Sequence, residues 1–215
     1  MEHEQELREF TINAIRELGI PIGEIHAEQF IRYLAHLIEW NKAINITAII
    51  DPKKIIIKHF VDSLTALVAT NFSQNCIVLD VGSGGGFPGI PLKIMRPDIR
   101  LVLVEPIQKK YSFLNSIIGL LKLHDASTFA GTIEQYTKHP LRQVIDMIVL
   151  RALKHEDIKK YFPALLISKG KLVLYRTEAI RNEAIGEDFH LVGETSILLP
   201  QGLGNRVITV LEKNN

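Results

Sequence analysis

Hydrophobic residues in the first 70 positions recur every three or four residues, the spacing of one face of an amphipathic helix. Gly19 followed by Pro21 ends the first segment, because neither residue continues a helix well. Asp51 followed by Pro52 begins the third, since aspartate is favoured as an N-cap and proline in the first helical turn. The pattern predicts three helices, with apolar stripes at Leu7, Phe10, Ala14 and Leu18, at Phe30, Leu34, Leu37 and Ile38, and at Ile57, Phe60, Val61, Leu64, Leu67 and Val68.

From residue 71 the pattern changes to short β-branched runs that alternate with helical ones. We expect strands at Ile77 to Val81, Leu101 to Val104, Ser127 to Ala130, Ile145 to Leu150 and Lys171 to Tyr175. Helical patterns lie between them, at Ile90 to Met95, Gln108 to Leu123, a short turn near Ile133, and Asp157 to Ser168. One more helix is expected after Tyr175. Two last strands, His190 to Leu198 and Arg206 to Leu211, are joined by turn-forming residues and predict an antiparallel hairpin.

Apolar strands separated by helices are typical of parallel strands that are covered on both faces. The sequence therefore predicts an α/β fold: a mostly parallel seven-stranded sheet with helices on both faces and one antiparallel strand near the edge. Residues 1–70 are expected to form an N-terminal helical cap over the cleft of a domain formed by residues 71–215. Burial of the third helix's stripe against the sheet would join the two parts.

Composition limits the kinds of partner that the chain can bind. Of its 215 residues, 47% are hydrophobic and 23% charged, and the formal net charge is +1, so no global cationic field holds nucleic acid. The single cysteine, Cys76, excludes an internal disulfide and a cysteine-rich zinc site, and we expect no metal. The first ten residues are acidic, unlike a signal peptide, and no apolar run approaches the roughly 20 residues of a membrane span. We expect a cytoplasmic protein without membrane contact.

The segment from Val78 to Gly89 carries the strongest chemical signal. An apolar strand ends in a loop with four glycines within five residues, more than a tight turn needs. One register, Gly84-x-Gly86-x-x-Gly89, fits a dinucleotide fingerprint. The other, Asp80-x-Gly82-x-Gly84-x-Gly86, begins directly at the strand end and suits a nucleoside without phosphate, such as S-adenosylmethionine (AdoMet). We favour AdoMet over NAD, because the dinucleotide register would begin two residues late.

Glu105 supports a nucleoside ligand in either register. It ends the second strand, 19 residues after Gly86, where a carboxylate can accept hydrogen bonds from both ribose hydroxyls. By itself, an acid at a strand end is common on protein surfaces. Its place one crossover after the glycine loop favours the ligand-binding role.

Three longer segments form a recognisable set. They are Asn45-Ile46-Thr47-Ala48-Ile49 with Asp51, Lys58-His59-Phe60-Val61-Asp62-Ser63-Leu64, and Asp80-Val81-Gly82-Ser83-Gly84-Gly85-Gly86-Phe87-Pro88-Gly89-Ile90-Pro91-Leu92. The shorter segments Lys109-Lys110, Phe113-Leu114 and Arg151-Ala152 add to them. With these segments the chain resembles the small-subunit ribosomal RNA methyltransferase G family, also called glucose-inhibited division protein B, whose members are Rossmann-like class I methyltransferases. The resemblance runs from about residue 30 to near the carboxyl end.

The resemblance implies methyl transfer from AdoMet to the N7 atom of a guanine in small-subunit (16S) ribosomal RNA. Guanine N7 carries a free lone pair, so alignment of the reactants can suffice without a general base, and we name no catalytic residue. The resemblance also implies AdoMet contacts at Gly82, Phe87, Ile133, Glu134 and Arg151. The chain departs from the family pattern at Thr132, where an arginine is usual, and at Leu150, where a serine is frequent.

Candidate substrate-binding residues in the same segments are Asn45, Thr47, Lys58, His59 and Asp62. Arg206, near the start of the last strand, is a further candidate. His59 and Asp62 are three residues apart and share a helix face, so they either border the cofactor and the target base or tie the third helix to the sheet. Arg151 follows the fourth strand, where it can contact the methionine moiety of the cofactor or the target nucleotide. Weak overall charge favours a structured ribosomal RNA particle over naked RNA as the partner, and we expect a monomer.

Three other functions are compatible with parts of this pattern. A dinucleotide oxidoreductase would use the register that starts at Gly84. A methyltransferase with a small-molecule or protein substrate would keep the loop but need no RNA. An assembly factor without activity is compatible with the departures at Thr132 and Leu150.

Overall fold

The computed structural model describes residues 2–180 and 186–215 and begins with helices. They are α1 (Glu2–Glu17), α2 (Glu24–Ile44) and a continuous helical segment made of α3 (Pro52–Ile55), the π-helix η1 (Ile56–Val61) and α4 (Asp62–Ala69). The side chain of Asp51 accepts a hydrogen bond from the Lys54 amide at 2.8 Å, which confirms the predicted N-cap. Val68 is 45% exposed, so its predicted place in the buried stripe is wrong.

Seven strands form one sheet in the order β3-β2-β1-β4-β5-β7-β6. β1 to β5 pair in parallel, and β7 runs antiparallel to both of its neighbours, as expected for one reversed strand near the edge. The predicted α/β fold and its last hairpin are confirmed. The strands are β1 (Ile77–Val81), β2 (Arg100–Glu105), β3 (Ala126–Ala130), β4 (Ile145–Arg151), β5 (Leu166–Arg176), β6 (Phe189–Leu198) and β7 (Asn205–Lys213).

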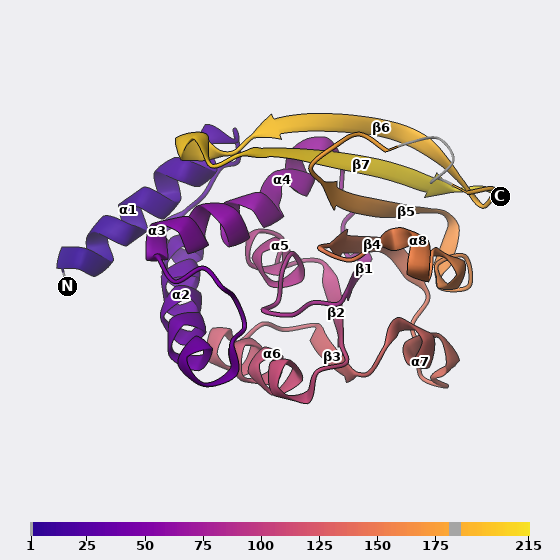
Figure 1. Cartoon of the computed structure of the whole chain (residues 1–215), viewed down its shortest axis with the longest axis horizontal. Coiled ribbons are helices and arrows are strands. Elements are labelled where there is room, and N and C mark those ends of the chain that lie inside the picture. The colour runs from indigo at the N-terminus through magenta and orange to yellow at the C-terminus, as the bar shows by residue number, and fades with distance from the viewer. Residues whose placement is uncertain (1, 181–185) are drawn as a thin grey trace.

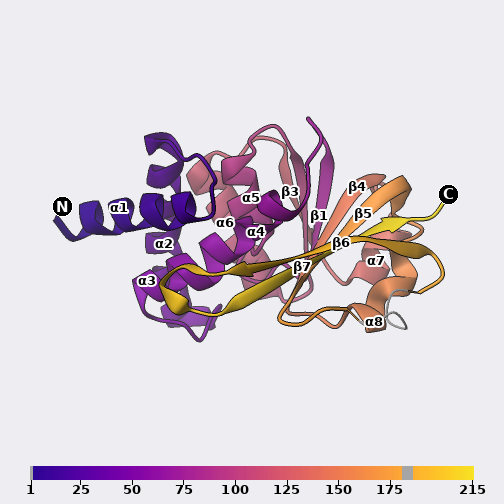
Figure 2. The same cartoon turned by 90° about the horizontal axis from the view of Figure 1, so that it is seen from above.

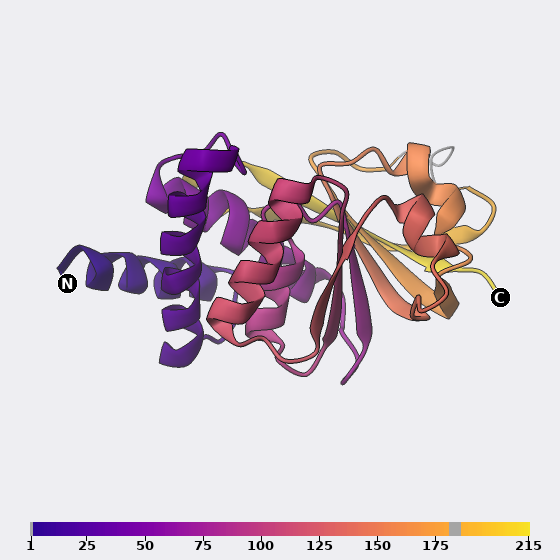
Figure 3. The same ribbon diagram turned by 90° about the horizontal axis from the view of Figure 1, so that it is seen from below.

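Helices connect the parallel strands and lie on both faces of the sheet (Figures 1 to 3). α5 (Gly89–Met95) and α6 (Gln108–Leu121) cover one face, and α7 (Ile133–Lys138), α8 (His155–Ile158) and the 3₁₀ turn η2 (Lys159–Tyr161) cover the other. A further 3₁₀ turn, η3 (Pro200–Gly202), joins the last two strands.

One predicted helix, Asp157 to Ser168, is wrong over most of its length. The helical turns end at Tyr161, and β5 already begins at Leu166. Pro163 lacks the amide hydrogen that a continuing helix would need, and Leu166 pairs with Ile145 of β4. The further helix predicted after Tyr175 has no stated bounds, and residues 181–185 of the segment between β5 and β6 lie outside the described residues.

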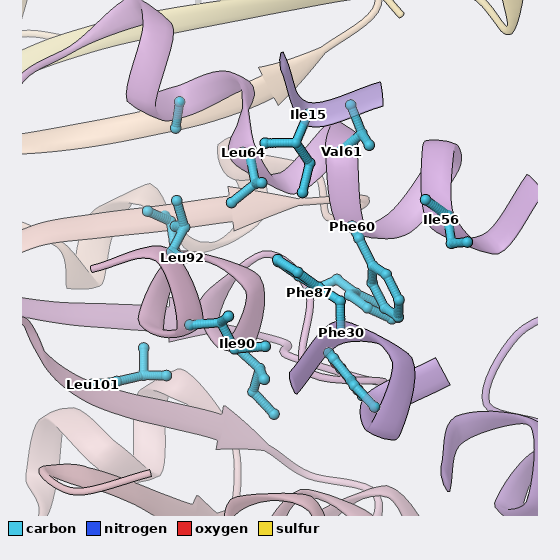
Figure 4. Packing of buried hydrophobic residues seen from close by; sticks show 14 of the residues in the cluster. Ile15, Phe30, Ile56, Phe60, Val61, Leu64, Phe87, Ile90, Leu92 and Leu101 are labelled. Atoms are coloured by element: carbon cyan, nitrogen blue, oxygen red, sulfur yellow. The ribbon is translucent and has the colours of Figure 1, made fainter. Parts of the chain in front are cut away.

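The helices of residues 1–70 share a hydrophobic core with one face of the sheet. Ile15, Phe30 and Phe60 belong to the same buried cluster as Leu92 of α5 and Leu101 of β2 (Figure 4). Cys76 is also buried in this cluster. A second cluster on the opposite face packs α7 and the segment after η2 against alternate strand residues. Within the described ranges, no helix is both long and apolar enough to cross a membrane.

Candidate functional site

A cavity of about 460 Å³ opens at the carboxyl ends of β1, β2 and β4. This edge is where ligands bind in open α/β sheets. We call it the first cavity. It is lined by Ile46, Thr47, His59, Val81, Gly82, Ser83, Gly84, Gly85, Phe87, Val104, Glu105, Pro106, Ile107, Lys110, Gly131, Thr132, Ile133, Arg151, Ala152, Leu153 and Ile158.

The glycine loop forms one wall of the first cavity in a conformation that side chains would obstruct. Gly82, Gly84 and Gly86 have φ angles of +72°, +57° and +88°, which favour glycine. A Cβ on Gly86 would lie 2.7 Å from the hydroxyl oxygen of Tyr33, and the Tyr33 hydroxyl donates a hydrogen bond to the Gly85 carbonyl. The loop therefore presents bare backbone, braced from behind by α2.

Glu105 lies opposite the loop with only 4% of its surface exposed. One carboxylate oxygen accepts from the Gly84 amide at 2.8 Å, and the other accepts from the Ile107 amide at 2.8 Å. Each oxygen of a carboxylate can accept a second hydrogen bond. The side chain thus joins the loop to the end of β2 and keeps capacity for a hydroxyl-bearing ligand.

Asp80 is fully buried beneath the glycine loop and does not line the first cavity. Its Oδ2 accepts from the Gly89 amide at 2.8 Å, whereas Oδ1 has no hydrogen-bond partner. Burial raises the pKa of this carboxyl from 3.8 to about 7. Gly86 does not line the cavity either, because Tyr33 and Ile90 pack against it.

His59 is fixed by hydrogen bonds on both ring nitrogens. Nδ1 is 3.4 Å from a terminal guanidinium nitrogen of Arg151, and Nε2 is 2.7 Å from the Thr47 hydroxyl. Arginine only donates, so Nδ1 accepts and the neutral ring donates from Nε2. The ring stacks on Phe87 at a centroid distance of 4.6 Å. Burial, together with the Arg151 charge, lowers the pKa of His59 from 6.5 to about 4, so the ring is neutral.

Asp62 is 1% exposed and lies between two arginines that are far away in the sequence. Its Oδ2 accepts from Arg151 at 2.9 Å and from Arg206 at 2.8 Å, and its Oδ1 accepts from the Nε of Arg206 at 2.6 Å. Arg151 also stacks over the Phe87 ring, 5.0 Å from its centroid. The carboxylate therefore fixes one guanidinium from β4 and one from β7 beside His59.

A second cavity of about 850 Å³ adjoins the first at the ends of β4 and β5. Lys58, Asp62 and Arg206 line only this cavity, whereas His59 and Arg151 line both. The full lining is Ile49, Lys58, His59, Asp62, Arg151, Ala152, Leu153, Lys154, Glu156, Tyr175, Arg176, Thr177, Glu178 and Arg206.

Two other predicted site residues lie outside these cavities. Asn45 lines a separate hollow beside α2. The carboxylate of Glu134 pairs with Lys138 at 2.8 Å, on the surface of α7. Thr132, the position that departs from the family pattern, caps α7: its hydroxyl accepts from the Gln135 amide at 3.2 Å, and the Gln135 side chain accepts from the Thr132 amide. Leu150 is a buried residue of β4.

Sequence reasoning missed several residues of the first cavity. Ile46 and Lys110 line it, although in the sequence they stand out only as members of the family segments. Leu153, also in the lining, gave no sequence signal; a Cβ on Gly82 would lie 2.4 Å from its Cδ1. Tyr33 is an aromatic residue at helical spacing, which is typical of a residue of the hydrophobic core. Its hydrogen bond to the glycine loop could therefore not be predicted from the sequence.

Comparison with known proteins identifies the family to which this chain is similar. The family model described as rRNA small subunit methyltransferase G matches residues 26–197. Ribosomal RNA small subunit methyltransferase G of Roseiflexus sp. is 38% identical over 204 residues, which cover 94% of this chain and 83% of that protein. The protein of the same name from Staphylococcus epidermidis is 30% identical over 213 residues, covering 95% and 89%.

Solved structures share the fold at much lower sequence identity. An O-methyltransferase from Bacillus cereus in complex with SAH has a TM-score of 0.60 and 16% identity, covering 85% of this chain and 90% of that one. MtNAS in complex with MTA and tNA has a TM-score of 0.61 and 13% identity, covering 100% and 88%. These similarities support the α/β architecture alone.

Proposed function

Since the chain belongs to the rRNA small subunit methyltransferase G family, we propose that it transfers the methyl group of AdoMet to the N7 atom of a guanine in small-subunit (16S) ribosomal RNA. Family membership supports the AdoMet-dependent methylation of ribosomal RNA. The choice of guanine N7 as the target atom goes beyond family membership and needs separate support. The observation that supports it most directly is the lack of a free proton acceptor at His59, the titratable ring on the wall between the two cavities.

The residues of the first cavity fit AdoMet. A volume of about 460 Å³ lies in the usual range of small-molecule sites. The backbone of Gly82 and Gly84 would hold the ligand closely, Glu105 would accept from the ribose hydroxyls, and Ile107 and Ile133 would offer apolar contacts to the adenine. When bound, AdoMet supplies an electrophilic methyl group on a sulfonium centre.

The protein's own side chains provide orientation rather than proton transfer. Guanine N7 has a lone pair and no proton, so it needs no general base to become nucleophilic. Both nitrogens of His59 are already engaged, and the ring is neutral and stacked on Phe87. Such a fixed ring is suited to holding Arg151 and Phe87 in place and to excluding water from the boundary between the cavities.

The dinucleotide interpretation has little physical support in this loop. Its second glycine, Gly86, would have to let the backbone approach a pyrophosphate. Gly86 instead packs against Tyr33 and Ile90 and does not line the first cavity. Pro88 also precedes the third glycine, Gly89, at a helix start that would need free amides for a phosphate.

Residues 1–70 serve, in this proposal, as the cap of the cofactor cleft. Ile46, Thr47 and His59 contribute to the lining of the first cavity, and Tyr33 braces its glycine loop. The cap would shield the methyl donor from water. We propose that the monomer acts on a ribosomal particle, because the net charge of +1 provides little general attraction for free RNA.

Mapping the methylated base tests this function. The purified protein, labelled AdoMet and small-subunit particles from cells that lack the enzyme are incubated together, with deproteinised RNA as a parallel substrate. We expect label in the RNA at one guanine that becomes cleavable by borohydride and aniline, the reaction of N7-methylguanosine. Label on another atom or base would contradict the N7 proposal, and stabilisation by NAD(H) instead of AdoMet in a thermal-shift assay would contradict the function altogether.

A further inference from the structure

The second cavity adjoins the first, and the two share part of their lining. His59, Arg151, Ala152 and Leu153 line both cavities. Direct transfer of a methyl group requires the two reacting atoms to be in contact, so ligands in the two cavities would have to meet at this shared boundary. The second cavity also lies at the carboxyl ends of β4 and β5, on the same edge of the sheet as the glycine loop.

The lining of the second cavity is rich in cations. The lining contains five cationic side chains and three carboxylates. One of these carboxylates, Asp62, is already paired with two arginines. The members are Lys58, Arg151, Lys154, Arg176 and Arg206 against Asp62, Glu156 and Glu178. Lys154 and the partly exposed Arg176 lie where backbone phosphates could approach from solvent. This balance favours an anionic ligand.

Asp62 fixes the two arginines without using all of their donors. Among the described residues, Arg206 donates from its Nε to Asp62 and from each terminal nitrogen to one acceptor, the Asp62 carboxylate or the Arg176 carbonyl. Each terminal nitrogen carries two hydrogens, so donors remain. The Nε of Arg151 likewise has no acceptor among the described residues. Two guanidinium groups with spare donors are therefore held rigidly at this cavity.

We propose that the second cavity binds the target nucleotide, and that Asp62 is a positioning residue which orients Arg151 and Arg206 toward O6 of a guanine, so that the adjacent N7 keeps its lone pair for the methyl group. The proposal rests on the function proposed above. Guanine presents an acceptor at O6, whereas adenine carries an amino donor at the same position. Fixed guanidinium donors therefore select guanine over adenine, while Lys154 and Arg176 bind the phosphates.

Direct binding of mononucleotides tests the proposal independently of any reaction. GMP and AMP are titrated by NMR into the full-length protein saturated with S-adenosylhomocysteine. We expect GMP to bind at least fivefold more tightly than AMP, and Arg206→Gln to remove this preference. Lys154→Gln and Arg176→Gln should weaken both nucleotides threefold or more and keep the preference. Arg100→Gln is the matched control, because Arg100 is exposed at the opposite edge of the sheet, at the start of β2.

Kinetics with ribosomal particles supply the second readout. We expect Lys154→Gln and Arg176→Gln to raise KM for the particle at least fivefold while Kd for S-adenosylhomocysteine stays within twofold. Asp62→Asn should lower kcat more than it raises this KM, because it misdirects the arginines. The side chains of Lys154 and Arg176 do not touch Asp62. Their glutamine variants therefore test the cavity even if Asp62→Asn or Arg206→Gln fails to fold.

The outcomes separate this proposal from the proposed function. If the wild type methylates guanine N7 while Lys154→Gln and Arg176→Gln leave KM and GMP binding unchanged, the second cavity is not the nucleotide site. Equal binding of GMP and AMP to the wild type overturns the selection by arginine. If no guanine is methylated but GMP binds as expected and Arg206→Gln abolishes the preference, the function fails and the assignment of the cavity stands.

Discussion

The hydroxyl of Tyr33 in α2 donates a hydrogen bond to the carbonyl of Gly85, 52 residues later in the glycine loop. The ring is fully buried and stacks on Phe60 at 4.8 Å and on Phe87 at 5.6 Å. One side chain thus joins the N-terminal helices to the loop of the proposed cofactor site. Figure 4 shows Phe30, Phe60 and Phe87 gathered in this region.

Tyr33→Phe should weaken cofactor binding with a small loss of stability. The substitution removes one buried hydrogen bond, worth about 1 kcal/mol, and leaves the Gly85 carbonyl without its partner. We expect a three- to tenfold rise in Kd for AdoMet, measured by calorimetry. Tyr136→Phe is the control, because the Tyr136 hydroxyl accepts from the Gln143 amide away from both cavities. Equal effects of the two variants on Kd would contradict a role for Tyr33 in the loop.

Gly86→Ala should destabilise the protein more than Gly202→Ala. Both glycines have positive φ, so both variants incur roughly 1 kcal/mol of backbone strain. A Cβ on Gly86 meets Tyr33 and Ile90, whereas a Cβ on Gly202 meets nothing within 4 Å. Overpacking at Gly86 should cost a further 1–3 kcal/mol or so, measured by urea denaturation. Similar losses for the two variants would show that the loop can move away from α2.

Asp80→Asn should reduce the pH dependence of stability. The pKa of Asp80 is raised to about 7 in the folded protein, so the folded state binds this proton more tightly than the unfolded state. Its contribution to stability is fully present below about pH 4 and is lost as the pH rises through about 7, by roughly 4 kcal/mol. Denaturant titrations from pH 4 to 8 should show the wild type losing stability relative to the variant. A constant difference between the two would exclude the raised pKa.

His59 should remain neutral throughout the physiological pH range. Burial beside Arg151 lowers its pKa from 6.5 to about 4 in the folded state. Its contribution to stability is therefore fully present above about pH 6.5 and is lost as the pH falls through about 4. Nitrogen NMR of the ring should show the neutral form, protonated at Nε2, down to about pH 5. A titration midpoint near pH 6.5 would contradict the buried arrangement with Thr47 and Arg151.

Thr132→Ala should cost about 1 kcal/mol of stability, because it removes the N-cap of α7. Thr132→Ser keeps a hydroxyl that can accept from the Gln135 amide and should retain most of the stability. Chemical denaturation of the three proteins measures the difference. If the serine variant loses as much stability as the alanine variant, the capping box does not stabilise the helix.

Much of the fold could be predicted because local patterns encode local burial. The periodicity of Ile57, Phe60 and Leu64 predicts a helix that packs on the sheet, and all three are buried. Val68 and the segment from Asp157 to Ser168 were predicted wrongly for one reason. Periodicity does not reveal which apolar residues find a partner, and only the pairing of Leu166 with Ile145 makes that segment a strand.

The α/β order of elements, the glycine loop and the family follow from the amino-acid sequence, since these depend on neighbouring residues and on the conformations that their backbones allow. The role of Asp62 depends on the folded arrangement of the chain. Its partners, Arg151 and Arg206, lie 89 and 144 residues further along the chain, on β4 and β7. No spacing rule connects residues so far apart. Their meeting depends on the strand order β4-β5-β7, which places both arginines above one edge of the sheet, against α4.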